Sequence, residues 1–165
     1  MNGLANAEKL FLKDEIMMVL SDAEELLPHL PMFQRLVYLR LKIPSVNLDC
    51  KPLLKLLRCS HHLKTLDFCE GISLLSDFSE NDNLMNPAPC CLLNEVKSIK
   101  IEKFSGNKKA LQAVEFLLKN ALVLKNMTII CIANSGRLHG KVTKLSKRFP
   151  KGSESCKVIV HSSVL

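Results

Sequence analysis

Two short segments combine residue types that could bind a metal ion or a phosphate. The first, CSHHLKTLDFC, places Cys59, His61, His62 and Cys69 close together. A structural zinc ion needs four ligands that converge tetrahedrally, and they usually come as two short-spaced pairs. Because His61 and His62 are adjacent just before a predicted strand, we expect their side chains to diverge. We interpret the segment as a polar turn between a helix and a strand.

The second segment, SGNKKA at 105–110, shares only a glycine and two lysines with a phosphate-binding loop. The chain also has no G-x-S-x-G nucleophile elbow and no H-E-x-x-H zinc motif. No group of residues has the types and spacing of a catalytic site. We therefore expect no enzymatic activity, no cofactor and no metal ion.

The most basic segment is RLHGKVTKLSKRF, near the C-terminus. Three cations share one face of a predicted helix and two more lie nearby, which gives a basic patch of Lys141, Lys144, Lys147, Arg148 and Lys151. Such a patch could contact nucleic-acid phosphates or an acidic protein. Nucleic-acid-binding surfaces usually add aromatic side chains for stacking, but the chain has one Tyr and no Trp. We favour a solvated helix face and keep nucleic-acid binding as the alternative.

Composition indicates a folded protein of the cell interior. Residues 1–80 hold 9 Lys or Arg against 11 Asp or Glu, whereas residues 81–165 hold 14 against 5. The seven cysteines are odd in number and form no C-x-x-C pair, which favours reduced thiols. No apolar run approaches the roughly 18 residues of a membrane span, and no secretory signal is recognisable. We expect a cytoplasmic or nuclear location, or both, and no membrane partner.

One pattern recurs along the chain and predicts the fold. The order apolar-x-x-apolar-x-apolar occurs in AEKLFL, LVYLRL, LKTLDF, VKSIKI and LKNMTI. The fourth positions are spaced by 29, 27, 33 and 28 residues, and they are Leu10, Leu39, Leu66, Ile99 and Met127. All but one spacing fits the range of about 20–29 residues of leucine-rich repeats.

Between these strands the apolar residues have helical spacing. Expected helix stripes are Ala23, Leu26, Leu27 and Leu30, then Leu53, Leu54, Leu56 and Leu57, and finally Val142, Leu145 and Phe149. Asn107 is a predicted N-cap, and CKVIVH is a predicted last strand. The predicted fold class is α/β, a right-handed leucine-rich-repeat-like solenoid with a curved parallel sheet on one face and helices on the other.

The outward strand positions of such a fold form columns across the sheet. The predicted columns are Tyr38, Thr65, Ser98 and Asn126, then Arg40, Asp67, Lys100 and Thr128, then Lys42, Cys69, Glu102 and Ile130. A mixed polar surface of this kind suits an unidentified protein partner, although a merely solvated sheet fits equally well. Our hypothesis is that Tyr38, Arg40, Asp67 and Lys100 bind a partner. The edge of the first strand, AEKLFLKD, also predicts self-association.

Two stretches, Cys90–Ile129 and Lys141–Val160, resemble the FBD domain of plant F-box/leucine-rich-repeat proteins. In that family a Cys-Leu-Leu run opens a strand, a Phe-x-Gly turn precedes the helix, and Phe-Pro and Ser-x-x-Cys precede the last strand. The corresponding residues here are Cys91–Leu93, Phe104–Gly106, Phe149–Pro150 and Ser153–Cys156. The segment before the Cys-Leu-Leu run departs from the family, because it lacks the usual Trp.

The resemblance implies a domain division and a function. Residues 1–70 would be a partial leucine-rich-repeat region, 71–89 a surface loop, and 90–165 an FBD domain that continues the solenoid. By resemblance, the chain is the substrate-recognition end of a ubiquitin-ligase receptor. No segment resembles the F-box, so we do not expect direct binding to a Skp-type adaptor.

Overall fold

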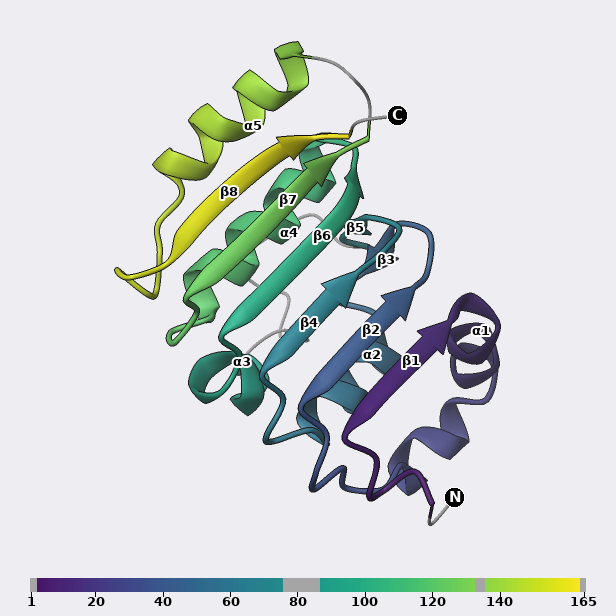
Figure 1. Ribbon diagram of the computed structural model, residues 1–165. Coiled ribbons are helices and arrows are strands. Elements are labelled where there is room, and N and C mark those ends of the chain that lie inside the picture. Colours follow the sequence, from purple (N-terminus) through teal and green to yellow (C-terminus); the bar gives the residue numbers. More distant parts are fainter. Residues whose placement is uncertain (1–2, 76–86, 133–135, 164–165) are drawn as a thin grey trace.

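The computed structural model describes residues 3–75, 87–132 and 136–163 (Figure 1). Helices and strands alternate along most of the chain. The strands are β1 (Lys9–Lys13), β2 (Tyr38–Lys42), β3 (Val46–Asn47), β4 (Thr65–Phe68), β5 (Ile72–Ser73), β6 (Ser98–Phe104), β7 (Asn126–Cys131) and β8 (Lys157–Ser162). The helices are α1 (Asp14–Asp22), the 3-10 helix η1 (Glu24–His29), α2 (Lys51–Arg58), α3 (Cys90–Asn94), α4 (Lys108–Asn120) and α5 (Gly136–Arg148).

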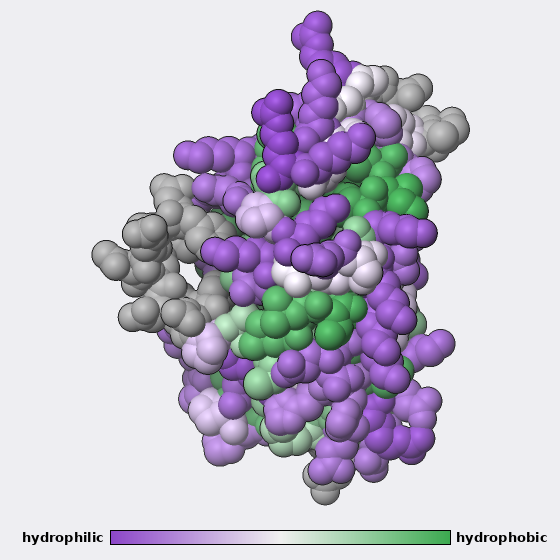
Figure 2. All heavy atoms as spheres, turned by 90° about the vertical axis from the view of Figure 1, so that its left-hand side faces the viewer, coloured by the Kyte–Doolittle hydropathy of each residue, from purple (hydrophilic) through white to green (hydrophobic). Residues whose placement is uncertain are grey.

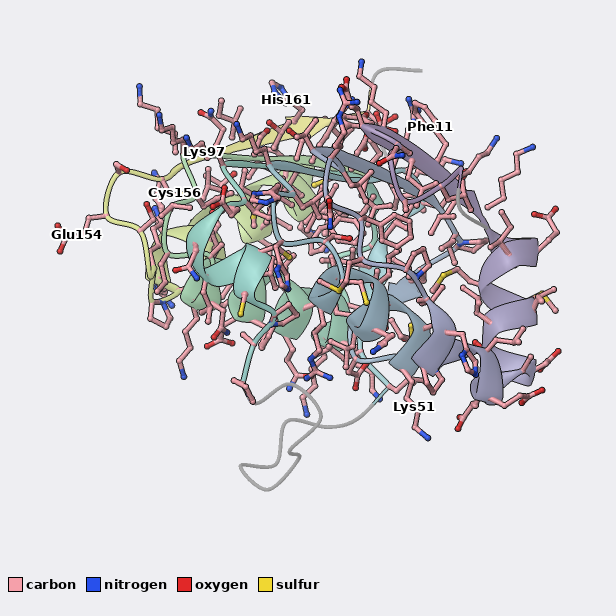
Figure 3. All side chains as sticks on the ribbon, turned by 90° about the horizontal axis from the view of Figure 1, so that it is seen from below. Phe11, Lys51, Lys97, Glu154, Cys156 and His161 are labelled. Atoms are coloured by element: carbon pink, nitrogen blue, oxygen red, sulfur yellow. The ribbon has the colours of Figure 1, made fainter. Side chains whose placement is uncertain are left out.

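The main sheet has six strands in the order β1-β2-β4-β6-β7-β8, and every neighbouring pair is parallel. Strands β3 and β5 form a separate parallel pair. The described helices lie on one side of the main sheet, and none of them covers the opposite side (Figure 3). The chain is therefore a mixed α/β protein with a parallel central sheet, because helical connections return each strand to the same direction.

The strand register confirms the first two columns predicted from the sequence. Tyr38 pairs with Thr65, Thr65 with Ser98, and Ser98 with Asn126. The second column pairs in the same order, through Arg40, Asp67, Lys100 and Thr128. Alternation along each strand then turns the intervening apolar residues toward the helices, where they are buried.

The helix over residues 108–120 begins as predicted. The side chain of Asn107 accepts a hydrogen bond of 2.8 Å from the backbone N–H of Ala110, so Asn107 is the N-cap of α4. One face of α4 is buried and carries Ala110, Ala113, Val114, Phe116, Leu117 and Leu118. The next element, β7, begins six residues after α4 ends, which is the helix-to-strand step repeated along the chain.

Three expectations from the sequence were wrong. The Cys-Leu-Leu run, expected to open a strand, lies in helix α3, which starts directly after Pro89. Pro89 has φ of −54°, and its backbone carbonyl accepts hydrogen bonds from the N–H groups of Leu92 and Leu93. The predicted helix with the stripe from Ala23 to Leu30 is the short 3-10 helix η1 (Glu24–His29) in place of an α-helix, and Pro28 inside it cannot donate a backbone hydrogen bond.

The third wrong expectation concerns α5. Leu145 was expected to pack inward, but it is only half-buried and lies beside the exposed cations of that helix. Val142 and Ser146 are the buried residues of α5, and Phe149, just beyond its end, is half-buried against the core. Position 145 lies at the side of the helix, because it is three residues from Val142 and turned by about 60° from it.

The predicted surface loop over 71–89 starts differently from the expectation. Its first residues include β5, and both Ile72 and Leu74 are buried. Residues 76–86 of that loop lie outside the described residues. Among the helices that the structure describes, none is long and apolar enough to cross a bilayer.

Candidate functional site

The open side of the sheet carries a group of interacting polar side chains. We call it the polar cluster, and its members come from β2, β4, β6 and the residue after β4: Tyr38, Arg40, Asp67, Cys69, Lys100 and Glu102. Each residue occupies an outward position of the two-residue strand period. The parallel register then places the outward positions of neighbouring strands about 4.8 Å apart.

Asp67 is the centre of the polar cluster. The hydroxyl of Tyr38 donates a hydrogen bond of 2.9 Å to Asp67 Oδ2, and Arg40 Nε lies 3.8 Å from the same oxygen. Asp67 is 5% exposed, although it lies on the open side of the sheet. The two longer side chains from β2 cover it, and they supply the donor and the cation that a buried carboxylate requires. Burial, followed by this hydrogen bond, raises the pKa of Tyr38.

Cys69 joins the same group through Arg40. The Arg40 Nε–H group donates to Cys69 Sγ at 2.9 Å, and this contact is the largest cause that raises the pKa of Arg40. Burial raises the pKa of the Cys69 thiol. A thiol with a raised pKa stays protonated near neutral pH, so Cys69 is a poor nucleophile. It acts as a weak acceptor that orients Arg40.

Ion pairs continue the polar surface onto β6. Lys100 Nζ lies 2.8 Å from Glu102 Oε1, and hydrogen bonding to Glu102 raises the pKa of Lys100. Lys103 Nζ lies 2.6 Å from Glu70 Oε2. Both lysine side chains are more than two-fifths exposed, so these pairs contribute little to stability. Their positive and negative groups remain available to a partner.

Three members of the polar cluster have ligand atoms within 4.8 Å of one another: Asp67, Cys69 and Glu102. Two carboxylates and a thiol are acceptable zinc ligands. Arg40 already lies against Asp67 and Cys69, however, and Lys100 against Glu102. A metal ion would have to displace both cations, so the arrangement is better matched to hydrogen bonding and charge pairing than to metal binding.

The metal segment considered from the sequence does not assemble. Cys59 is buried, whereas His61 and His62 are exposed in the turn before β4. Their ligand atoms form no group of three with Cys69 among the residues that the structure describes. Cys69 instead belongs to the polar cluster. The columns predicted from the sequence placed Cys69 and Glu102 beside each other. Their closeness to Asp67 is seen only in the structure, where Arg40 contacts both Cys69 and Asp67 and Lys100 pairs with Glu102.

The basic patch is divided by the structure. Three of its residues, Lys141, Lys144 and Arg148, line a shallow hollow on the outer side of α5 together with Gly136, Arg137, Gly140 and Leu145. Lys147 is exposed beside this lining, and Lys151 is exposed beyond the helix. Arg137 was missed from the sequence, although its spacing of four residues from Lys141 places it on the same face.

Comparisons with known proteins agree with the FBD resemblance. Residues 86–129 match the FBD family model. The chain is 23% identical over 134 residues to an FBD-associated F-box protein of Arabidopsis thaliana, and the match covers 79% of this chain and 27% of that relative. The chain thus spans about a quarter of the relative's length. No solved structure matches.

Proposed function

We propose that this chain, which fits an FBD-containing plant protein, is a non-catalytic protein-interaction module. The open side of its sheet would bind an unidentified protein partner through the polar cluster. The observation that carries the proposal is the convergence of Tyr38, Arg40 and Asp67 in one bonded group on a surface that no described helix covers.

The chemistry of the polar cluster suits protein recognition. Tyr and Arg are, with Trp, enriched among the side chains that contribute most of the binding energy at protein interfaces. Here Asp67 orients both of them, so less conformational entropy would be lost when a partner binds. Lys100 and Glu102 add a charge of each sign at the border, which favours a partner with a complementary mixed surface.

We further propose that the parallel strands belong to a right-handed leucine-rich-repeat-like solenoid. The strands follow one another in sequence order across the main sheet, as stacked repeats do. The relative's description as an F-box protein supports a place at the substrate-recognition end of a ubiquitin-ligase receptor. Such a receptor module would work in the cytoplasm or the nucleus.

The test is affinity capture from plant extract followed by mass spectrometry. The wild-type chain is compared with a variant in which Tyr38, Arg40, Asp67 and Lys100 are replaced by alanine. A matched control replaces Asn126, Thr128 and Lys157, which are outward residues of β7 and β8. We expect the fourfold variant to lose proteins that the wild type and the control both retain. Equal recovery by all three chains would refute the proposed surface.

Because Asp67 is buried, its replacement in the fourfold variant could disturb the fold. A second variant that leaves Asp67 in place is therefore needed. Replacement of Arg40 and Lys100 alone removes two side chains that are 46% and 44% exposed. Each of the two side chains forms an ion pair from a substantially exposed position, and such pairs are typically worth about 1 kcal/mol or less, so the fold should be retained. Loss of the same proteins by this double variant would therefore report binding and not unfolding.

A further inference from the structure

Helix α1 presents an outward face that combines acids with exposed apolar side chains. Met18, Val19 and Asp22 lie three, four and seven residues after Glu15, so all four share this face. Met18 is 58% exposed and Val19 is 59% exposed. The inward face of the same helix carries the buried Met17. We call the outward set the acidic face.

Helix α5 presents an outward face of the opposite charge. We call it the basic face, and its cations are Arg137, Lys141, Lys144 and Arg148. Gly140 interrupts this face, and a Cβ atom added there would meet nothing within 4 Å. The half-buried Leu145 also lines the hollow. Hydrophilic side chains dominate the upper part of the surface where α5 lies (Figure 2).

Both faces lack partners within the described part of the chain. No ion pair there involves Glu15 or Asp22, and none involves the four cations of the basic face. Glu24 lies two residues after the acidic face and does form an ion pair, but its partner is Lys51. The charges on the two faces are therefore available to an outside group.

The two faces match in spacing as well as in charge. Glu15 and Asp22 are seven residues apart, which is about 10.5 Å along a helix. Arg137 and Lys144 have the same separation, as do Lys141 and Arg148. Between the acids lie Met18 and Val19, and between Arg137 and Lys144 lies Gly140. A glycine without a side chain leaves room for a partner's apolar side chain to approach the helix backbone.

We propose that the acidic face of one chain binds the basic face of a second copy. Helix α1 follows β1 and α5 packs against β8, so the faces lie at opposite ends of the main sheet (Figure 1). A contact between two different faces is head-to-tail, and it leaves one face of each kind free for a further copy. The sequence predicted self-association at the edge of the first strand, and the contact inferred here is carried by the neighbouring helix.

The same observations favour a protein over a nucleic acid as the occupant of the basic face. Its lining contains a leucine and two glycines but no aromatic side chain for base stacking. The complementary acids occur on the same chain, at equal concentration and at the same spacing. This inference is independent of the proposed function, because it uses neither the polar cluster nor the open side of the sheet.

The first measurement is the weight-average mass by sedimentation velocity, at about 50 mM salt and over rising protein concentration. We expect the mass to rise from the 18.5 kDa of one chain and to return toward it at about 500 mM salt, where exposed charges are screened. Nuclease-treated protein is used throughout. A constant 18.5 kDa at every concentration, or a rise that occurs only after RNA or DNA is added, would overturn the inference.

The decisive measurement uses charge reversal. The base-reversed variant carries Lys141→Glu, Lys144→Glu and Arg148→Glu, and the acid-reversed variant carries Glu15→Lys and Asp22→Lys. Each variant alone should weaken self-association about tenfold or more, because like charges then face each other. Mixed together, the two variants should associate again in alternation, because α1 and α5 of each variant then meet a face of opposite charge on the other variant. One chain with all five substitutions should self-associate again, which also shows that the substitutions are compatible with folding.

A control variant reverses Lys64, Lys97 and Lys125, three exposed lysines in the turns before β4, β6 and β7. It changes the net charge as much as the base-reversed variant does, but away from both faces. We expect it to self-associate like the wild type. If either single-face variant still associates normally, or if the fivefold variant remains a monomer while folded, the two faces are not the contact.

Discussion

The two sides of the main sheet differ sharply, although the same strands supply both. Leu39, Leu66, Ile99 and Met127 form a column facing the helices, and none is more than 1% exposed. One residue earlier in each strand, the column of Tyr38, Thr65, Ser98 and Asn126 is polar and lies on the open side. The buried column stabilises the fold by removing apolar surface from water. The outward column does not contribute to this buried core, so its side chains can serve to bind a partner.

The same contrast occurs within two adjacent residues of α3. Cys90 is exposed, whereas Cys91 is fully buried and its Sγ donates to the carbonyl oxygen of Leu57 at 3.4 Å. Burial raises the pKa of Cys91 to about 12. At pH 8 only about one Cys91 thiol in ten thousand would be ionised, and the thiolate is the reactive form. Sequence neighbours can therefore differ greatly in chemistry.

The largest expected effect is on alkylation of these two cysteines. We expect iodoacetamide at pH 8 to modify Cys90 at least about a thousandfold faster than Cys91, since Cys91 is both buried and protonated. Peptide mass spectrometry over a time course measures both rates in one sample. In 6 M guanidinium chloride the two rates should converge. Equal rates in the native chain would contradict the burial of Cys91.

The next effect compares neighbouring positions of β4. Leu66→Ala should lower the free energy of unfolding by about 2–5 kcal/mol, because it leaves a cavity beneath the sheet where Leu66 is 0% exposed. Thr65→Ala, one residue earlier and on the open side, should cost about 1 kcal/mol or less. Urea denaturation followed by circular dichroism measures both. A cost for Thr65→Ala that equals the cost for Leu66→Ala would remove the distinction between the two columns.

Much of this arrangement was predictable because it depends on periodicity. The repeated apolar pattern aligned Leu39, Leu66, Ile99 and Met127, and the strand register confirms that alignment. Local hydrogen bonding was equally accessible, as the N-cap at Asn107 shows. Both signals are short-range. A residue's place in a strand, or before a helix, is set by neighbours within a few positions.

The predictions that were wrong or missing concern segments where the local sequence pattern is ambiguous or too short. The run Cys90–Asn94 has enough apolar residues for a strand, but Pro89 directly precedes it and the structure shows a helix. Strands β3 and β5 are only two residues long each, so they contain too few residues to show any period. Their pairing joins segments that lie about 25 residues apart in the sequence, a distance over which no local pattern operates.

The polar cluster was predictable in position but not in detail. The columns gave the places of Tyr38, Arg40, Asp67 and Lys100, which the register confirms as paired positions. The burial of Asp67 and the contact between Arg40 and Cys69 were not foreseen. Both depend on the direction in which long, flexible side chains lie, and several rotamers are compatible with the same backbone.

Asp67 is the residue that breaks the simple contrast between the two sides. It occupies an outward position, yet it is 5% exposed and carries two partners from β2. We expect Asp67→Ala to lower the free energy of unfolding by about 1–2 kcal/mol, less than Leu66→Ala. The loss comes mainly from the hydrogen bond with Tyr38, because Arg40 is half-exposed and can find water instead. Urea denaturation at pH 7 measures it.

The matched variant Asp67→Asn separates the hydrogen bond from the charge. Its amide oxygen can still accept from the Tyr38 hydroxyl, but its neutral side chain no longer attracts Arg40. We expect it to cost less than about 1 kcal/mol, since an ion pair with a half-exposed partner is strongly screened. An Asp67→Asn cost equal to that of Asp67→Ala would mean that the charge holds the polar cluster together. If neither variant lost stability, Asp67 would contribute to partner binding and not to the stability of the fold. The outward residues Thr65 and Asp67 would then both differ from the buried column in the same way.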